Sequence, residues 1–91
     1  MVNGREFESA WRRIEGYAGE TFTQIRGGKF TYEVLGSNLR PDRTNRNLPR
    51  SDFEKAFAMC PLPNTVPVQH LQGPSYLYAI LMERRISQGE W

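Results

Sequence analysis

The stretch Phe7-Glu8-Ser9-Ala10-Trp11-Arg12-Arg13-Ile14-Glu15-Gly16-Tyr17-Ala18 does most to decide the fold. Its apolar side chains recur at helical spacing and fall on one stripe of an α-helix, while the other side is charged. Asn3 and Glu6 have the spacing of a capping box, and Gly16 and Gly19 offer helix ends. We therefore predict a helix over residues 7–18 that packs one face on the core. The stripe consists of Phe7, Ala10, Trp11, Ile14, Tyr17 and Ala18.

Two segments rich in β-forming residues follow this helix, Thr21–Arg26 and Lys29–Leu35. Gly27-Gly28 joins them, and glycine readily takes the positive φ angles of a two-residue hairpin turn. We predict a β-hairpin here. A short third strand is expected at Leu39-Arg40, where Pro41 would confine it to the edge of the sheet because proline has no backbone donor.

Residues 40–50 contain turn-forming residues, so we expect an irregular surface connection or an edge strand. Ser51 and Glu54 then have capping-box spacing and predict a short helix that ends before Pro61. The apolar face of this helix would be formed by Phe53, Ala56, Phe57 and Cys60.

The segment that begins at Pro61 is rich in proline, which favours an extended loop. Gly73-Pro74-Ser75 predicts the start of a last helix, and Tyr76–Met82 is apolar nearly all round, as expected of a helix at the centre of a fold. Arg84 and Arg85 would end this helix and complement its dipole. The predicted fold is one small α+β domain over residues 1–91, with a helix, then a β-hairpin or three-stranded antiparallel sheet, then two helices.

The composition is that of a small folded protein. Apolar residues make up 38% and charged residues 24% of 91, which favours a single folded core over a disordered chain. No apolar run approaches the roughly 18 residues of a transmembrane helix, and the N-terminal pattern is not that of an export signal. The single cysteine excludes an intramolecular disulfide. We expect a cytoplasmic protein without a membrane partner.

Two runs, Arg43–Ala56 and Gln72–Leu81, resemble a family of small uncharacterised bacterial proteins, and the likeness extends over most of the chain. The resemblance implies a bacterial setting and supplies no catalytic residues. It leaves open whether the chain acts alone or as a module of a larger enzyme system.

The sequence contains no complete catalytic or metal-binding set. Cys60 and the sole histidine, His70, could act as nucleophile and base, but Cys60 continues an apolar helix face and His70 lies in a proline-rich loop. A structural zinc site needs four ligands, and the separated Glu33 and Asp42 carry little information about a carboxylate site. Gly27-Gly28 lacks the spacing of a phosphate-binding loop. We therefore expect no cofactor, no metal and no hydrolytic chemistry.

Arginines are concentrated in residues 40–50, where four of them are opposed only by Asp42, and the resulting +3 exceeds the +2 of the whole chain. Arginine can bind phosphates through two hydrogen bonds, and asparagine offers short polar contacts to nucleic acid. One interpretation is therefore a nucleic-acid-binding surface. A solvated loop whose arginines pair with carboxylates elsewhere is the other interpretation. The predicted surface consists of Arg26, Lys29, Arg40, Arg43, Asn45, Arg46 and Arg50.

The apolar last helix also permits a homodimer, in which Tyr76, Tyr78 and Met82 would form the interface. Three functions follow from the sequence. The first is a non-enzymatic interaction module that binds nucleic acid through the arginine-rich loop. The second is a homodimeric adaptor that binds a protein partner, and the third is a small enzyme or an accessory domain of an enzyme system.

Overall fold

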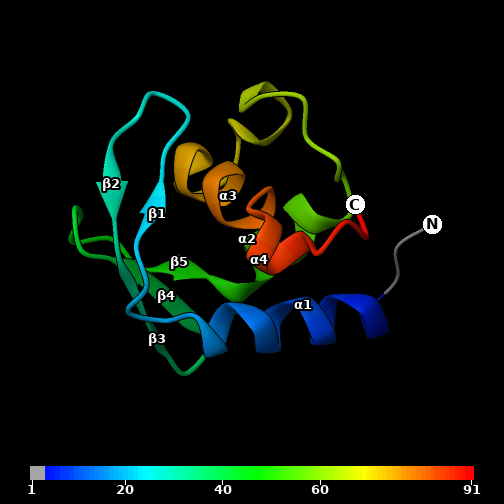
Figure 1. The fold of residues 1–91 in the computed structure, drawn as a ribbon, viewed down its shortest axis with the longest axis horizontal. Coiled ribbons are helices and arrows are strands. Elements are labelled where there is room, and N and C mark those ends of the chain that lie inside the picture. Colours follow the sequence, from blue (N-terminus) through cyan, green and yellow to red (C-terminus); the bar gives the residue numbers. More distant parts are fainter. Residues whose placement is uncertain (1–3) are drawn as a thin grey trace.

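Helix α1 (Gly4–Gly16) opens the part of the chain that the computed structural model describes, which is residues 4–91 with side chains from residue 6. The predicted helix is confirmed, although it ends at Gly16, two residues earlier than expected. The helix runs along one side of the molecule (Figure 1), and the part of the apolar stripe that lies on it is buried, with Ala10 and Ile14 completely so. Ala18, beyond the end of the helix, is exposed. The predicted Asn3 cap lies outside the described residues.

A hairpin of β1 (Phe22–Thr23) and β2 (Lys29–Phe30) follows, with Phe22 paired to Phe30. The predicted hairpin is confirmed, but a two-residue turn at Gly27-Gly28 is wrong. Gly28 is already paired across the hairpin, because its carbonyl accepts from the Gln24 N–H at 2.7 Å, so it is not a central residue of the turn. The chain reverses two residues earlier, at Ile25 and Arg26, where the Gly27 N–H donates to the Gln24 carbonyl at 2.8 Å and Gly27 has a φ of 91°.

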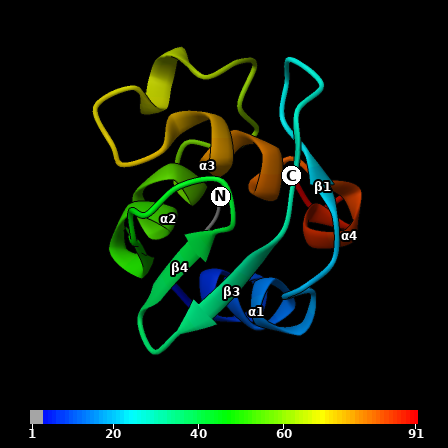
Figure 2. The same ribbon diagram turned by 90° about the vertical axis from the view of Figure 1, so that its left-hand side faces the viewer.

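The second predicted strand, residues 29–35, is in fact two strands that belong to different sheets. Strand β3 (Tyr32–Leu35) leaves the hairpin and pairs with β4 (Asn38–Pro41), as Figure 2 shows. The break lies at Thr31, whose N–H donates to the Asp42 carboxylate at 3.0 Å and whose carbonyl accepts from the Asp42 N–H at 2.9 Å. Asp42 therefore supplies the partners that Thr31 lacks in either ladder.

Strand β4 is the central strand of a three-stranded antiparallel sheet with the order β3-β4-β5. A third strand at Leu39-Arg40 is therefore confirmed, whereas its place at an edge is wrong, because β5 (Leu48–Pro49) covers its other side. Strand β5 pairs only with Asn38 and Leu39, so Pro41 lies beyond that pairing. The segment 42–47 is an irregular loop, as expected.

Helix α2 (Arg50–Phe57) begins directly after β5, and the predicted capping box is wrong because Ser51 lies inside the helix. Pro49 occupies the N-cap position without a side-chain hydrogen bond. The Arg50 N–H instead donates to the Ser37 carbonyl at 2.8 Å, so pairing with the β3–β4 turn satisfies this first amide.

Residues 61–72 form a loop with one 3-10 turn, η1 (Val66–Val68), before α3 (Pro74–Leu81). The predicted helix start at Pro74 is confirmed. Arg84 and Arg85 do not end α3, because Glu83 is extended and the two arginines begin a separate short helix, α4 (Arg84–Ser87). Among residues 4–91, no helix has the length and apolar character needed to cross a membrane.

Helix α3 runs through the middle of the fold, between α2, the hairpin and α4 (Figure 1), and it contacts each of them. Its side chains Leu77, Ile80 and Leu81 are completely buried. Two groups of aromatic rings pack around it. One joins α1 to α2 and contains Phe7, Trp11, Phe53 and Phe57. The other joins the strands to α3 and contains Phe22, Phe30 and Tyr32 of the strands with Tyr76 of α3.

Candidate functional site

The loop between β4 and β5 holds its arginines in place through neutral groups. Arg40, at the end of β4, donates from Nε to the side-chain oxygen of Asn47 at 2.9 Å, which joins the two ends of the loop. The Arg46 N–H donates to the Thr44 hydroxyl at 3.2 Å, and the Arg46 guanidinium lies 3.5 Å from the amide oxygen of Gln72. An amide oxygen orients a guanidinium without cancelling its charge.

Arg43 connects this loop to the hairpin. A methyl group added to Gly28 would lie only 2.6 Å from Nη1 of Arg43 and 2.8 Å from the side-chain oxygen of Gln24. The guanidinium therefore packs against the bare backbone of Gly28, next to Lys29 of β2. The structure thus brings the hairpin and the loop, separated in sequence by the whole of β3 and β4, onto one region of the protein.

Arg50 is not part of this region, although sequence proximity grouped it with the loop. Its guanidinium forms an ion pair with Glu8 and lies over the rings of Phe7 and Trp11, 5.0 and 5.8 Å from their centroids. Arg50 therefore joins α2 to α1. The interpretation in which loop arginines pair with carboxylates elsewhere holds for this residue.

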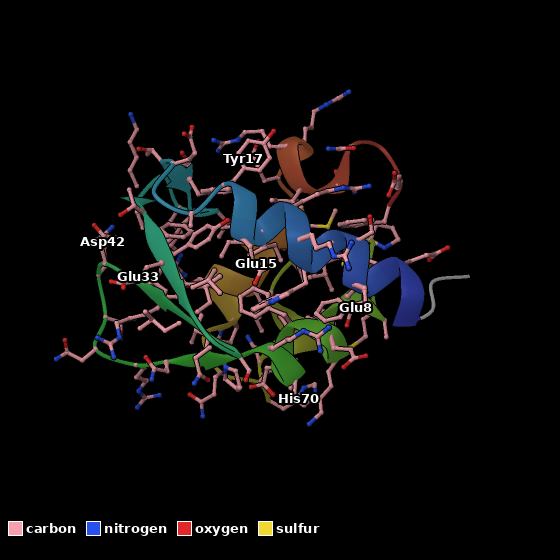
Figure 3. All side chains as sticks on the ribbon, turned by 90° about the horizontal axis from the view of Figure 1, so that it is seen from below. Glu8, Glu15, Tyr17, Glu33, Asp42 and His70 are labelled. Atoms are coloured by element: carbon pink, nitrogen blue, oxygen red, sulfur yellow. The ribbon has the colours of Figure 1, made fainter. Side chains whose placement is uncertain are left out.

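The other predicted cations are exposed, and the ion pairs among the described side chains include none of them; those pairs involve Arg13, Arg50 and Arg85. Two carboxylates lie nearby. Asp42 already accepts from Thr31, and Glu33 stands opposite Arg40 in the β3–β4 register. Figure 3 shows Asp42 and Glu33 at the opposite end of the molecule from Glu8. We call this region the arginine surface, defined as Arg26, Lys29, Arg40, Arg43, Asn45 and Arg46.

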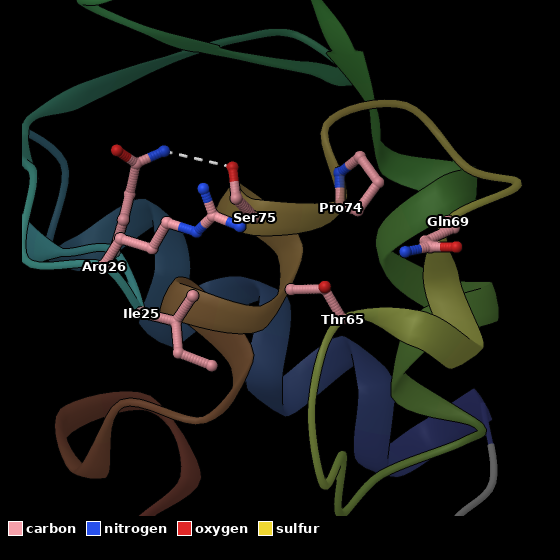
Figure 4. A pocket seen from close by; sticks show the side chains of 7 residues that line it. Ile25, Arg26, Thr65, Gln69, Pro74 and Ser75 are labelled. Carbon is pink, nitrogen blue, oxygen red and sulfur yellow. Dashed lines mark hydrogen bonds between the residues drawn. The ribbon is translucent and has the colours of Figure 1, made fainter.

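A pocket of about 430 Å³ lies beside the hairpin tip. In Figure 4, Ile25 and Arg26 stand on one side of it and Thr65 and Gln69 on the other, with the start of α3 between them. The walls are tied together by a hydrogen bond of 3.0 Å from the Gln24 amide to the Ser75 hydroxyl. Sequence reasoning missed this pocket, because no local pattern reports that segments so far apart in the chain meet. Its lining consists of Gln24, Ile25, Arg26, Thr65, Gln69, Pro74 and Ser75.

The one cysteine is a poor nucleophile in this fold. Burial raises the pKa of the Cys60 thiol to about 12, and its Sγ donates to the Ala56 carbonyl at 3.5 Å. The thiol is therefore protonated near neutral pH. His70 is exposed in the loop after η1 (Figure 3). Within the described part of the chain, no three His, Cys, Asp or Glu side chains come together in a group that could hold a metal ion.

The three residues predicted as a dimer interface are half-buried and pack against the protein's own core. The Tyr76 ring meets Phe30 edge-on with centroids 4.9 Å apart, and the sulfur of Met82 accepts from the Leu62 N–H at 3.4 Å. Part of the α3 surface is thus used within the monomer. A homodimer through Tyr78 and its neighbours stays a prediction.

Comparison with models of known protein families, with curated proteins and with solved structures finds no significant match. The resemblance to small bacterial proteins therefore stays a prediction, and the argument for function depends on the geometry of the arginine surface and the pocket.

Proposed function

We propose that this protein is a non-enzymatic module that binds nucleic acid through the arginine surface. One observation carries the proposal. Arg13, Arg50 and Arg85 form ion pairs with carboxylates, whereas none of the described ion pairs involves a cation of the arginine surface. Nucleic-acid phosphates hold condensed cations, and unpaired arginines that neutralise the phosphates release those cations, which favours binding.

The neutral partners of these arginines favour the same function. Arg40 is oriented by Asn47 and Arg46 by Gln72, so each guanidinium is positioned in the absence of bound phosphate and keeps its full charge. A side chain that is already ordered loses less entropy on binding. Arg43, resting on Gly28, lies between the loop and the hairpin cations. A phosphate backbone that crosses this region would meet several guanidinium groups in succession.

The test is a titration of fluorescent single-stranded and duplex oligonucleotides at about 50 mM and about 200 mM salt, read by anisotropy. We expect measurable binding at the lower concentration and a steep loss at the higher one. The variant Arg43→Ala/Arg46→Ala should bind more weakly and reduce the slope of log K against log salt by about 1 for each phosphate contact that is lost.

The matched control is Arg12→Ala/Arg84→Ala, which removes the same charge from exposed positions on α1 and α4. It should retain most of the affinity. Absence of binding at low salt, or an equal loss in both double variants, would overturn the proposal. Equal affinity for a polyglutamate of the same charge would also overturn it, because the surface would then belong to an acidic protein partner.

A further inference from the structure

The pocket beside the hairpin tip has the dimensions of a small-molecule site and is lined mainly by polar residues. Its volume of about 430 Å³ lies within the range of roughly 300–1,000 Å³ that is typical of such sites. Both Gln24 and Gln69 contribute amides, which offer donors and acceptors together. Thr65 and Ser75 contribute hydroxyl groups. A ligand that suits this lining has an edge of mixed donors and acceptors.

The charge of the lining narrows the class of ligand further. No carboxylate lines the pocket, and Arg26 is its one charged residue, so a cationic ligand is disfavoured. Ile25 is 54% exposed although it is a large apolar residue, and Pro74 adds a second apolar surface. An apolar face, a hydrogen-bonding edge and one adjacent negative charge are the features of a nucleotide base with its phosphate.

Gln24 links the pocket to the arginine surface. Its amide nitrogen donates to Ser75 across the pocket, while its amide oxygen lies beside Gly28, where the Arg43 guanidinium packs. Arg26 belongs to both regions by definition. A strand whose phosphates follow the arginine surface would therefore pass the mouth of the pocket.

We infer that the pocket receives one unstacked base of a single-stranded nucleic acid, with Arg26 on the adjoining phosphate. The inference rests on the function proposed above and specifies its ligand. In a duplex the bases are stacked and paired, so a single strand can place a base in the pocket at lower cost. Gln69 and Thr65 would bond the edge of the base, and Ile25 would cover its face.

The experiment compares a short oligothymidylate with an abasic strand of equal length, which carries the same phosphates without bases. For the wild-type protein we expect the abasic strand to bind about tenfold more weakly, since contacts to one base typically contribute a difference of this order. The variant Thr65→Ala/Gln69→Ala should reduce that difference while leaving the affinity for the abasic strand unchanged. Val66→Ala is the matched control, because Val66 is an exposed neighbour of Thr65 that does not line the pocket.

The outcomes separate the inference from the proposed function. Equal affinity of the wild-type protein for both strands would overturn the base pocket and leave phosphate binding intact. A difference that persists in Thr65→Ala/Gln69→Ala, with native circular dichroism, would also overturn it. Failure of both strands to bind at low salt would overturn the proposed function and the pocket with it.

Discussion

Among the described residues, the arginines with side-chain partners fall into two regions that differ in the kind of partner. On the helical side, Arg13 donates to the Ile86 carbonyl at 2.8 Å and forms an ion pair with Glu90 at 2.9 Å. On the sheet side, the guanidinium groups of Arg40 and Arg46 donate to the side-chain amide oxygens of Asn47 and Gln72. In the first arrangement, an ion pair neutralises the guanidinium charge and joins two elements. In the second, a neutral amide orients the guanidinium and leaves its charge available to a ligand. A net charge of +2 conceals this division, because it counts both kinds equally.

Arg85 shows most clearly what a structural arginine does. Its guanidinium lies 4.2 Å from the centroid of Phe22 and donates to the Thr21 carbonyl at 2.7 Å, so it fastens α4 to the start of the hairpin. Arg50 has the same role between α2 and α1. The comparison teaches that the partner of an arginine, rather than its place in a basic run, decides whether it can serve a ligand.

The largest effect is expected from Arg85→Ala, which should lower the free energy of unfolding by about 2 kcal/mol through loss of the hydrogen bond and the cation–π contact. Denaturant titration measures it. Arg84→Ala, at the exposed neighbouring position, should change the value by less than about 0.5 kcal/mol. Arg43→Ala/Arg46→Ala should resemble this control in stability although it loses affinity for oligonucleotides. The division between the two regions would fail if Arg43→Ala/Arg46→Ala destabilised the fold as much as Arg85→Ala.

A smaller effect is expected from pH. Burial raises the pKa of Cys60 from 9.0 to about 12, and burial also raises the pKa of the Tyr32 hydroxyl, against the opposing influence of Arg85. A raised pKa means that the folded state holds the proton more tightly. The contribution of each group to the free energy of unfolding is therefore fully present below that group's ordinary pKa. It is lost progressively as the pH rises above about 9.

Denaturant titrations at pH 8 and at several pH values above 9 should accordingly show that the free energy of unfolding falls as the pH rises. In Tyr32→Phe/Cys60→Ala the decline should be shallower, since neither replacement ionises. Tyr32→Phe also removes the hydrogen bond of 2.6 Å to the Ile14 carbonyl, so this variant starts from a lower stability at pH 8. Stability that rose with pH over this range would contradict the prediction. Oligonucleotide affinity per folded molecule should change little, because four of the five cations of the arginine surface are arginines, which stay protonated.

The smallest effect is expected from Gly28→Ala. The new methyl group would meet the tips of the Arg43 and Gln24 side chains, which are flexible and can move aside, so stability should change by less than about 0.5 kcal/mol. The displaced guanidinium should weaken oligonucleotide binding two- to threefold, roughly, as the arginine surface loses its ordered centre. Gly16→Ala, where no atom lies within 4 Å of the added methyl group, should leave the affinity unchanged. Equal affinity in both variants would show that the position of Arg43 on Gly28 is irrelevant to binding.

Local patterns determined the elements of this fold but not their partners. The apolar stripe of α1 and the Gly73-Pro74 start of α3 are visible in the sequence, because helical periodicity and proline chemistry act within a few residues. The division of residues 29–35 between two sheets is not visible, since it depends on Asp42 binding Thr31. The start of α2 likewise depends on the hydrogen bond from the Arg50 N–H to the Ser37 carbonyl, and no capping motif in the sequence indicates it.

The same limit applies to the candidate site. The sequence by itself determined that residues 40–50 carry a surplus of positive charge and that Gly27 permits a tight reversal nearby. Only the tertiary structure decided that Arg50 turns to Glu8, that Arg43 rests on Gly28, and that Gln24 meets Ser75 beside a pocket. Charge and periodicity are properties of neighbouring residues along the chain. Ion pairing and pocket formation depend on which distant segments pack together, and the packing of the whole core determines which segments those are.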